Sequence, residues 1–256
     1  MALDGRGAAR PARRWGEGDR RIPGVRATLF AVPASHASLA AELMLRHKGV
    51  DYRRVDFPAG PHRVLVRLRG FPGDRVPAVR FEDGRGAQGT RELPRVLDEL
   101  MPEPRLVPDD PRALHAEAWA DEVLQQWARR MVAGAGSRDP DALAGRGAGG
   151  RLDALLTRHE RPRRLVARAV LTAFRVTKEQ QQDDLERTPQ LLDRVDAWIE
   201  EGVLNGRELR SADFAVASSL ALVEYIVALG PELQRRPLMA LMDRVFSGSD
   251  GARDRA

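Results

Sequence analysis

The sequence predicts an α/β N-terminal domain with a mixed sheet, followed by a C-terminal domain built only from helices. Short apolar strands alternate with helical segments over residues 27–101, a proline-rich stretch occupies 102–111, and amphipathic segments dominate residues 112–247. A chain of 256 residues is long enough for two modest domains of this kind. The proline-rich stretch is therefore the expected linker between them.

The first domain is expected to have the order β-α-β-α-β-β-α. Hydrophobic periodicity places strands at Thr28–Val32, Tyr52–Phe57, Val76–Phe81 and Ala87–Gly89, and helices at Ser38–Lys48, His62–Leu68 and Thr90–Met101. Asp83-Gly84 predicts a tight hairpin turn between the last two strands. Strands separated by a single helix favour right-handed crossovers, with helices on both faces of the sheet.

The second domain is expected to be entirely helical. A helix starting at Thr188-Pro189 is predicted because threonine is a typical N-cap and proline suits the first helical position. The other expected segments are an amphipathic helix at Ala113–Val132, a loop at Ala133–Gly150, basic helical residues at 151–180, a buried helix at Asp213–Leu229 and a closing helix at Leu238–Phe246.

Composition excludes several classes of protein. Cysteine is absent, which excludes disulfide scaffolding, cysteine-ligated metals and a protein thiol nucleophile. No apolar run approaches the roughly 18 to 20 residues of a membrane helix, and no signal-peptide core follows the start. We therefore expect a cytoplasmic protein with no metal site and no membrane contact.

The formal charge of +5 is concentrated near the start of the chain. Residues 1–26 hold seven arginines against three acidic side chains and few apolar residues. Such a segment buries too little surface to fold, so we expect a disordered basic tail there, and a short flexible tail at 248–256. The rest of the chain is close to neutral, so a nucleic-acid partner is not expected.

Ser35 is the first candidate for chemistry. It lies in the turn between the first expected strand and the first expected helix. The unpaired backbone N–H groups at a helix N-terminus favour an anion or a thiolate. A helix cap is the alternative role of this hydroxyl.

Five segments, in order, resemble those of the glutathione S-transferase family over about residues 28–246. They are the spacing from Ser35 to Lys48-Gly49-Val50, the Val76-Pro77 pair, the Gly89-Thr90 pair, Leu106-Val107-Pro108 and Ser211–Phe214. The resemblance implies a thioredoxin-like N-terminal domain and an all-helical bundle after it. It also implies a cis peptide bond before Pro77, a homodimer, a structural capping role for Asp213 and a place in detoxification.

The same resemblance implies a set of site residues. Ser35 would be catalytic, because a hydroxyl that donates a hydrogen bond to the glutathione sulfur stabilises the thiolate and lowers the thiol pKa. His36 and Ser38 lie on the same turn. Ser211 is expected to cap the helix that contains Asp213. The remaining candidates are Val76 and Pro77 for the cysteinyl backbone, Thr90 and Arg91 for the γ-glutamyl carboxylate, Gln88, and His62 and Arg63 for the glycyl carboxylate.

The resulting prediction is a glutathione S-transferase-like enzyme with glutathione as co-substrate and a small, apolar electrophile bound near Trp119, Trp127 or the helix expected at 113–132. Gly89 departs from the family pattern, because it has no side chain to accept from the glutathione ammonium, so another small thiol stays open. The absence of cysteine argues against thiol reduction through a mixed disulfide. The alternative is a non-catalytic binding or protein-association module with the same fold.

Overall fold

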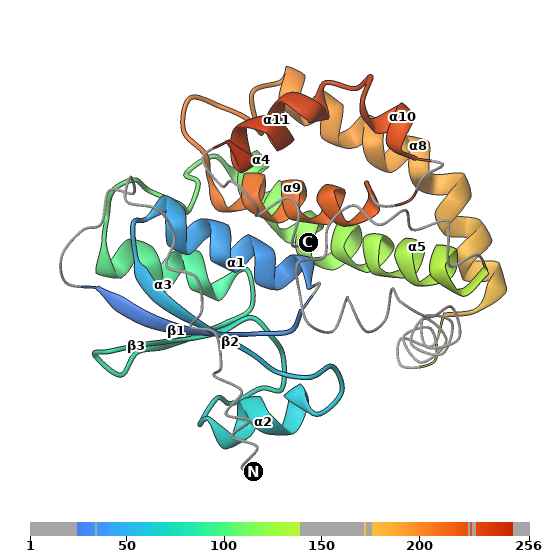
Figure 1. Cartoon of the computed structure of the whole chain (residues 1–256). Coiled ribbons are helices and arrows are strands. Elements are labelled where there is room, and N and C mark those ends of the chain that lie inside the picture. The colour runs from blue at the N-terminus through green and yellow to red at the C-terminus, as the bar shows by residue number, and fades with distance from the viewer. Residues whose placement is uncertain are drawn as a thin grey trace, which may run out of the picture.

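The computed structural model describes residues 25–33, 35–138, 172, 176–224, 226 and 229–247. The expected tails at 1–26 and 248–256 and the basic segment at 151–180 therefore lie largely outside the described residues. Figure 1 shows a sheet and its helices on one side of the molecule and a helical half on the other. No helix among the described residues combines the length and hydropathy of a membrane span.

The sheet has four strands in the order β2-β1-β3-β4. Its strands are β1 (Arg26–Ala31), β2 (Asp51–Asp56), β3 (Ala78–Phe81) and β4 (Gly86–Gln88). β1 pairs in parallel with β2 and antiparallel with β3, which pairs antiparallel with β4. The predicted mixed sheet is confirmed, and so is the hairpin turn, where Gly84 has a φ of 89°.

Helices cover both faces of the sheet, as expected. α1 (His36–His47) and α3 (Glu92–Leu100) lie on one face, and α2 (His62–Leu68) lies on the other (Figure 1). Alternate residues of β1 explain the two layers: Leu29 packs into the large core with α1, whereas Phe30 packs into a small core with Val66 of α2.

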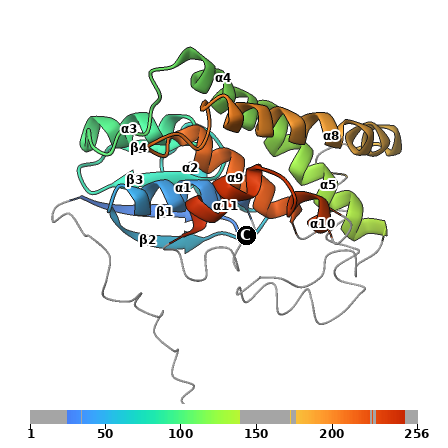
Figure 2. The same ribbon diagram turned by 90° about the horizontal axis from the view of Figure 1, so that it is seen from above.

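The helical half is arranged around one buried helix. It consists of α4 (Pro111–Trp119), the π-helical turn η1 (Ala120–Leu124), α5 (Gln125–Arg138), α8 (Lys178–Glu200), α9 (Ser211–Val223), α10 (Gly230–Leu233) and α11 (Leu238–Phe246). Every residue of α9 is buried. It lies between α1 and α11 (Figure 1), and α5 runs beside α8 (Figure 2).

Two predicted boundaries in this half are wrong. α5 continues to Arg138, so residues 133–138 are helical where a loop was predicted, and the rest of the segment predicted at Ala133–Gly150 lies outside the described residues. α8 begins at Lys178 and runs through Pro189, so the Thr188-Pro189 pair does not open a helix. The Thr188 hydroxyl instead donates to the carbonyl of Asp184, 2.8 Å away, one turn earlier in the same helix.

The start of α9 also differs in detail from the prediction. The Asp213 carboxylate accepts from the backbone N–H groups of Arg210 and Asn205, each at 2.7 Å, which confirms its capping role. Ser211 does not cap the helix, because its hydroxyl donates to Glu117 at 2.6 Å. α9 ends at Val223, earlier than the predicted Leu229.

Replacing Pro189 tests the continuity of α8. Proline has no N–H for the carbonyl one turn earlier, and it costs up to about 3 kcal/mol relative to alanine in a helix interior. Pro189 is exposed, so alanine fits without repacking. We expect Pro189→Ala to raise the free energy of unfolding by about 1–2 kcal/mol, measured by urea denaturation. A destabilised variant would contradict the continuous helix.

Candidate functional site

Ser35 is the N-cap of α1. Its backbone is extended, and its Oγ accepts from the N–H of Ser38 at 3.3 Å. A hydroxyl carries one donor besides its two acceptor positions. The hydrogen bond from Ser38 therefore leaves the Ser35 hydrogen available for an acceptor outside the helix, so the capping role and the predicted role toward sulfur are compatible.

Three segments meet at the edge of the sheet where Ser35 lies. The register pairs Phe30 of β1 with Ala78 of β3, and Ala78 with Gln88 of β4. The N–H of Gly89 donates to the carbonyl of Pro77 at 2.8 Å. The turn after β1, the Val76–Pro77 segment and the β4–α3 connection are thus neighbours, and the predicted cis bond before Pro77 is confirmed.

His36 and Ser38 are both buried, with 2% and 0% of their surface exposed. Among the described residues, neither the Nε2 of His36 nor the Oγ of Ser38 has a hydrogen-bond partner. Burial, and then the positive charge of Arg129 in α5, lower the pKa of His36 to about 3. The imidazole is therefore neutral at pH 7.

The predicted γ-glutamyl residues already bind partners within the chain. Thr90 is buried, and its hydroxyl donates to Asp121 of η1 at 2.9 Å. Gln125 donates to both Thr90 and Asp121 at 3.2 Å. Arg91 pairs with Glu122 at 3.2 Å. These contacts fix the β4–α3 connection against the helical half.

Asp121, Gln125 and Arg129 were missed by the sequence analysis. They follow one another on η1 and α5, at a spacing that sequence periodicity assigns to the polar side of an amphipathic helix. The helical pattern does not show which distant segment of the chain contacts the polar side of this helix. The π-helical turn also rotates the side chains that follow it, as such turns often do near functional sites.

Gln88 and Gly89 connect β4 to the segment before α3, and the Gln88 side chain is bonded within the chain. The Gln88 side chain accepts from the N–H of Gly73 at 2.9 Å and donates to the carbonyl of Arg75 at 2.8 Å. It therefore holds the segment before Val76 in place. Gly89 has a φ of 91°, a backbone conformation that disfavours any side chain. This conformation accounts for a glycine at the position where the resemblance implies an acidic or amide residue.

The Gly89 backbone can be tested directly. Nothing lies within 4 Å of a Cβ added there, so the cost of Gly89→Ala is conformational and not steric. We expect the variant to lose about 1–2 kcal/mol of unfolding free energy, measured by urea denaturation. Unchanged stability would contradict the left-handed conformation.

His62 and Arg63 stand at the start of α2. The Nδ1 of His62 accepts from the N–H of Gly60 at 3.1 Å, while Arg63 is exposed. Burial, and then the charge of Arg63, lower the pKa of His62. No hydrogen bond or ion pair among the described residues joins either side chain to the Ser35 turn.

The two tryptophans expected to line an electrophile site belong to the packing of the helical half. Trp127 is 1% exposed, and its Nε1 donates to the Asp184 carbonyl and the Thr188 hydroxyl, each at 3.3 Å. Trp119 packs edge-on against Trp198, with ring centroids 5.1 Å apart. The Trp127 side chain is therefore almost entirely covered by other residues of the chain, and the position of the electrophile near these tryptophans or the 113–132 segment stays a prediction.

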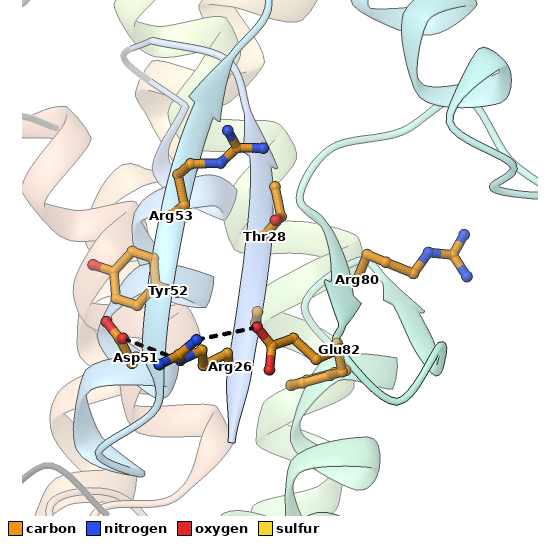
Figure 3. A pocket seen from close by; sticks show the side chains of 9 residues that line it. Arg26, Thr28, Asp51, Tyr52, Arg53, Arg80 and Glu82 are labelled. Atoms are coloured by element: carbon orange, nitrogen blue, oxygen red, sulfur yellow. Dashed lines mark ion pairs between the residues drawn. The ribbon is translucent and has the colours of Figure 1, made fainter. Parts of the chain in front are cut away.

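A hollow of about 450 Å³ lies elsewhere on the sheet, beside the first residues of β1. Figure 3 shows Arg26 between Asp51 and Glu82, with ion-pair distances of 3.9 and 3.7 Å. Thr28 and Arg53 also line it. The Ser35 turn follows the other end of β1, so this hollow is separate from the candidate site.

Solved glutathione S-transferases share this architecture. One from Rhodospirillum rubrum is 18% identical, with a TM-score of 0.58 over 86% of this chain and 88% of that one. One from Methylobacillus flagellatus with GSH bound is 18% identical, with a TM-score of 0.58 over 89% and 98%. One from Ceriporiopsis subvermispora in complex with glutathione is 14% identical, with a TM-score of 0.58 over 88% and 97%.

No protein-family model matches the chain, and no curated protein matches it significantly. The structural likeness therefore defines the class of fold. The chain has the glutathione S-transferase fold, with a thioredoxin-like N-terminal half and an all-helical C-terminal half.

Proposed function

We propose that the chain is a glutathione S-transferase-like enzyme that activates the sulfur of glutathione, or of a related small thiol, for attack on a small electrophile. The observation that carries this proposal is the Ser35 hydroxyl, which caps the 12-residue helix α1 and keeps a hydrogen to donate. It lies at the sheet edge that also holds Pro77 and Gly89. Solved proteins of the same fold with glutathione bound support the choice of thiol.

The proposed chemistry needs little from the protein beyond position and charge. Donation from Ser35 and the partial positive charge at the start of α1 stabilise a thiolate and lower the thiol pKa. The thiolate forms a bond to the electrophilic carbon, the leaving group departs from that carbon, and the thiol proton passes to solvent. Holding the thiol and the electrophile together at the edge of the sheet beside Ser35 accelerates the reaction further.

Binding and turnover test the proposal together. We expect the protein to be retained on immobilised glutathione and to conjugate glutathione to 1-chloro-2,4-dinitrobenzene faster than buffer alone. A column that carries the dipeptide cysteinylglycine, which lacks only the γ-glutamyl group, reports whether that group matters. Failure to bind either column and failure to turn over the electrophile would refute the enzyme as proposed.

A second candidate, a non-catalytic binding module of the same fold, is favoured by the contacts around Thr90. Its hydroxyl is donated to Asp121 and Arg91 is paired with Glu122, so a γ-glutamyl carboxylate has to compete with intrachain partners. Retention on a thiol column without any turnover would support this candidate.

We also propose that the chain forms a homodimer and is located in the cytoplasm. Light scattering after gel filtration tests the homodimer.

A further inference from the structure

The Thr90 hydroxyl has no hydrogen left for a ligand. A hydroxyl carries a single donor, and that of Thr90 is directed to the Oδ1 of Asp121 at 2.9 Å. The Nε2 of Gln125 donates to the Thr90 oxygen and to the same Oδ1, each at 3.2 Å. Thr90 and Gln125 are 4% and 3% exposed, so these hydrogen bonds are largely shielded from water. They hold the Asp121 carboxylate against the β4–α3 connection.

Asp121 lies where a carboxylate of a bound thiol would have to accept from Thr90. The hydrogen bond from Gly89 to Pro77 places the β4–α3 connection at the same edge of the sheet as the Ser35 turn. A thiol with its sulfur at Ser35 therefore meets Thr90 when it extends along this connection. A ligand carboxylate there has to displace the Asp121 oxygen and then lie beside a second negative charge, and like charges at short distance repel.

The other side-chain donors of this connection are also taken. Arg91 pairs with Glu122 at 3.2 Å, and the Gln88 side chain donates to the carbonyl of Arg75 at 2.8 Å. The Arg91–Glu122 pair is weak, because its two side chains are 46% and 66% exposed and water competes for both. The hydroxyl bonded to Asp121 is buried, so this is the contact that a ligand carboxylate has to break.

We infer that Asp121 gives the chain a preference for small thiols with no carboxylate at the end that meets Thr90, so that glutathione is a poorer substrate than the same thiol without its γ-glutamyl α-carboxylate. The inference rests on the proposed function and adds the class of thiol to it. Ser35 acts on the sulfur, whereas Asp121 selects among the groups joined to the cysteinyl amine. Asp121 is thereby a specificity-determining residue.

Glutathione and 4-aminobutanoyl-cysteinylglycine form a matched pair of thiols. The second is glutathione without the α-carboxylate of its γ-glutamyl group, and it keeps the ammonium, the cysteine and the glycine. With either thiol the sulfur bonds to the ring carbon of 1-chloro-2,4-dinitrobenzene, the carbon–chlorine bond breaks, chloride leaves, and the thiol proton passes to solvent. The readout is the ratio of kcat/KM for glutathione to that for the analogue, each corrected for the uncatalysed reaction.

We expect this ratio to be below one in the wild type. Asp121→Asn removes the charge and keeps an oxygen that accepts from Thr90, so it should raise the ratio about tenfold, and Asp121→Ser provides a second neutral variant with the same expected change. Asp183→Asn removes the same charge from an exposed position on α8 and should keep the wild-type ratio. Thermal melts establish that each variant is folded. A wild-type ratio above one, an unchanged ratio in the neutral Asp121 variants, or an equal rise in Asp183→Asn overturns the inference.

A wild-type protein that conjugates neither thiol refutes the proposed function, and the preference is then decided by binding alone. Isothermal titration calorimetry gives the Kd of each thiol for the wild type and for Asp121→Asn. Tighter binding of the analogue than of glutathione by the wild type, with a smaller difference in Asp121→Asn, supports the inference. Equal affinities in the wild type, tighter binding of glutathione, an unchanged difference in Asp121→Asn, or no measurable binding of either thiol overturns it.

Discussion

Ser35→Ala is expected to lower kcat/KM for conjugation of glutathione about 100-fold, the size of effect seen when one donor to a developing anion is removed. The alanine cannot donate to the sulfur, so less of the bound thiol ionises at neutral pH. It also cannot accept from the N–H of Ser38, so the unfolding free energy should fall by about 1 kcal/mol. Steady-state kinetics and urea denaturation measure the two effects separately.

Ser35→Asp is the matched control. A carboxylate is among the best N-caps and is favoured by the dipole of α1, so the variant should be at least as stable as Ser35→Ala. It has no hydrogen to donate at neutral pH, and its charge repels a thiolate. Low activity in both variants, with different stabilities, assigns the loss to chemistry. Near wild-type activity in Ser35→Asp would show that Ser35 serves only as a helix cap.

Acid is expected to destabilise the protein through His36. The folded-state pKa of His36 is lowered to about 3 from its ordinary value of 6.5, chiefly by burial. Above pH 6.5 the imidazole is neutral in both states and its contribution to stability is complete. As the pH falls from 6.5 toward 3, the unfolded chain takes up a proton that the folded chain does not, and stability is lost. By pH 4.5 the loss reaches about 3 kcal/mol.

His36→Gln isolates this effect, because glutamine does not titrate. The unfolding free energy of both proteins is measured by urea denaturation at several values between pH 7.5 and 4.5. The wild-type value should fall more steeply, by the amount attributed to His36, while the carboxylates contribute equally to both curves. Parallel curves would mean that the folded protein accepts the proton on His36 without cost.

The strands and helices of the first half could be predicted from sequence because their signals are local. The short apolar run in β1, the glycine after α1 and the Asp83-Gly84 turn each specify a short stretch of backbone. The predicted helix start at Thr188-Pro189 was wrong because it, too, relied on a local signal. Its local pattern is that of a helix start, but Trp127, from a distant part of the chain, and the Asp184 carbonyl, one turn earlier in α8, hold Thr188 inside the helix.

Only part of the candidate site could be predicted from the sequence. Ser35 and the Val76–Pro77 segment could be found because each has a recognisable neighbourhood. Asp121 and Gln125 could not, since their importance depends on which side of η1 and α5 meets Thr90. The φ of Gly89 likewise explains a departure from the family pattern that the sequence alone presents as a missing side chain.

The complete burial of α9 has a consequence for how the chain unfolds. α9 packs against α1, and the residues of both helices belong to one continuous core. Separating the two halves would expose the apolar side of α1, the helix whose first turn carries Ser35. The two halves should therefore melt in a single cooperative transition, and the thioredoxin-like half produced alone should not keep the Ser35 turn in place.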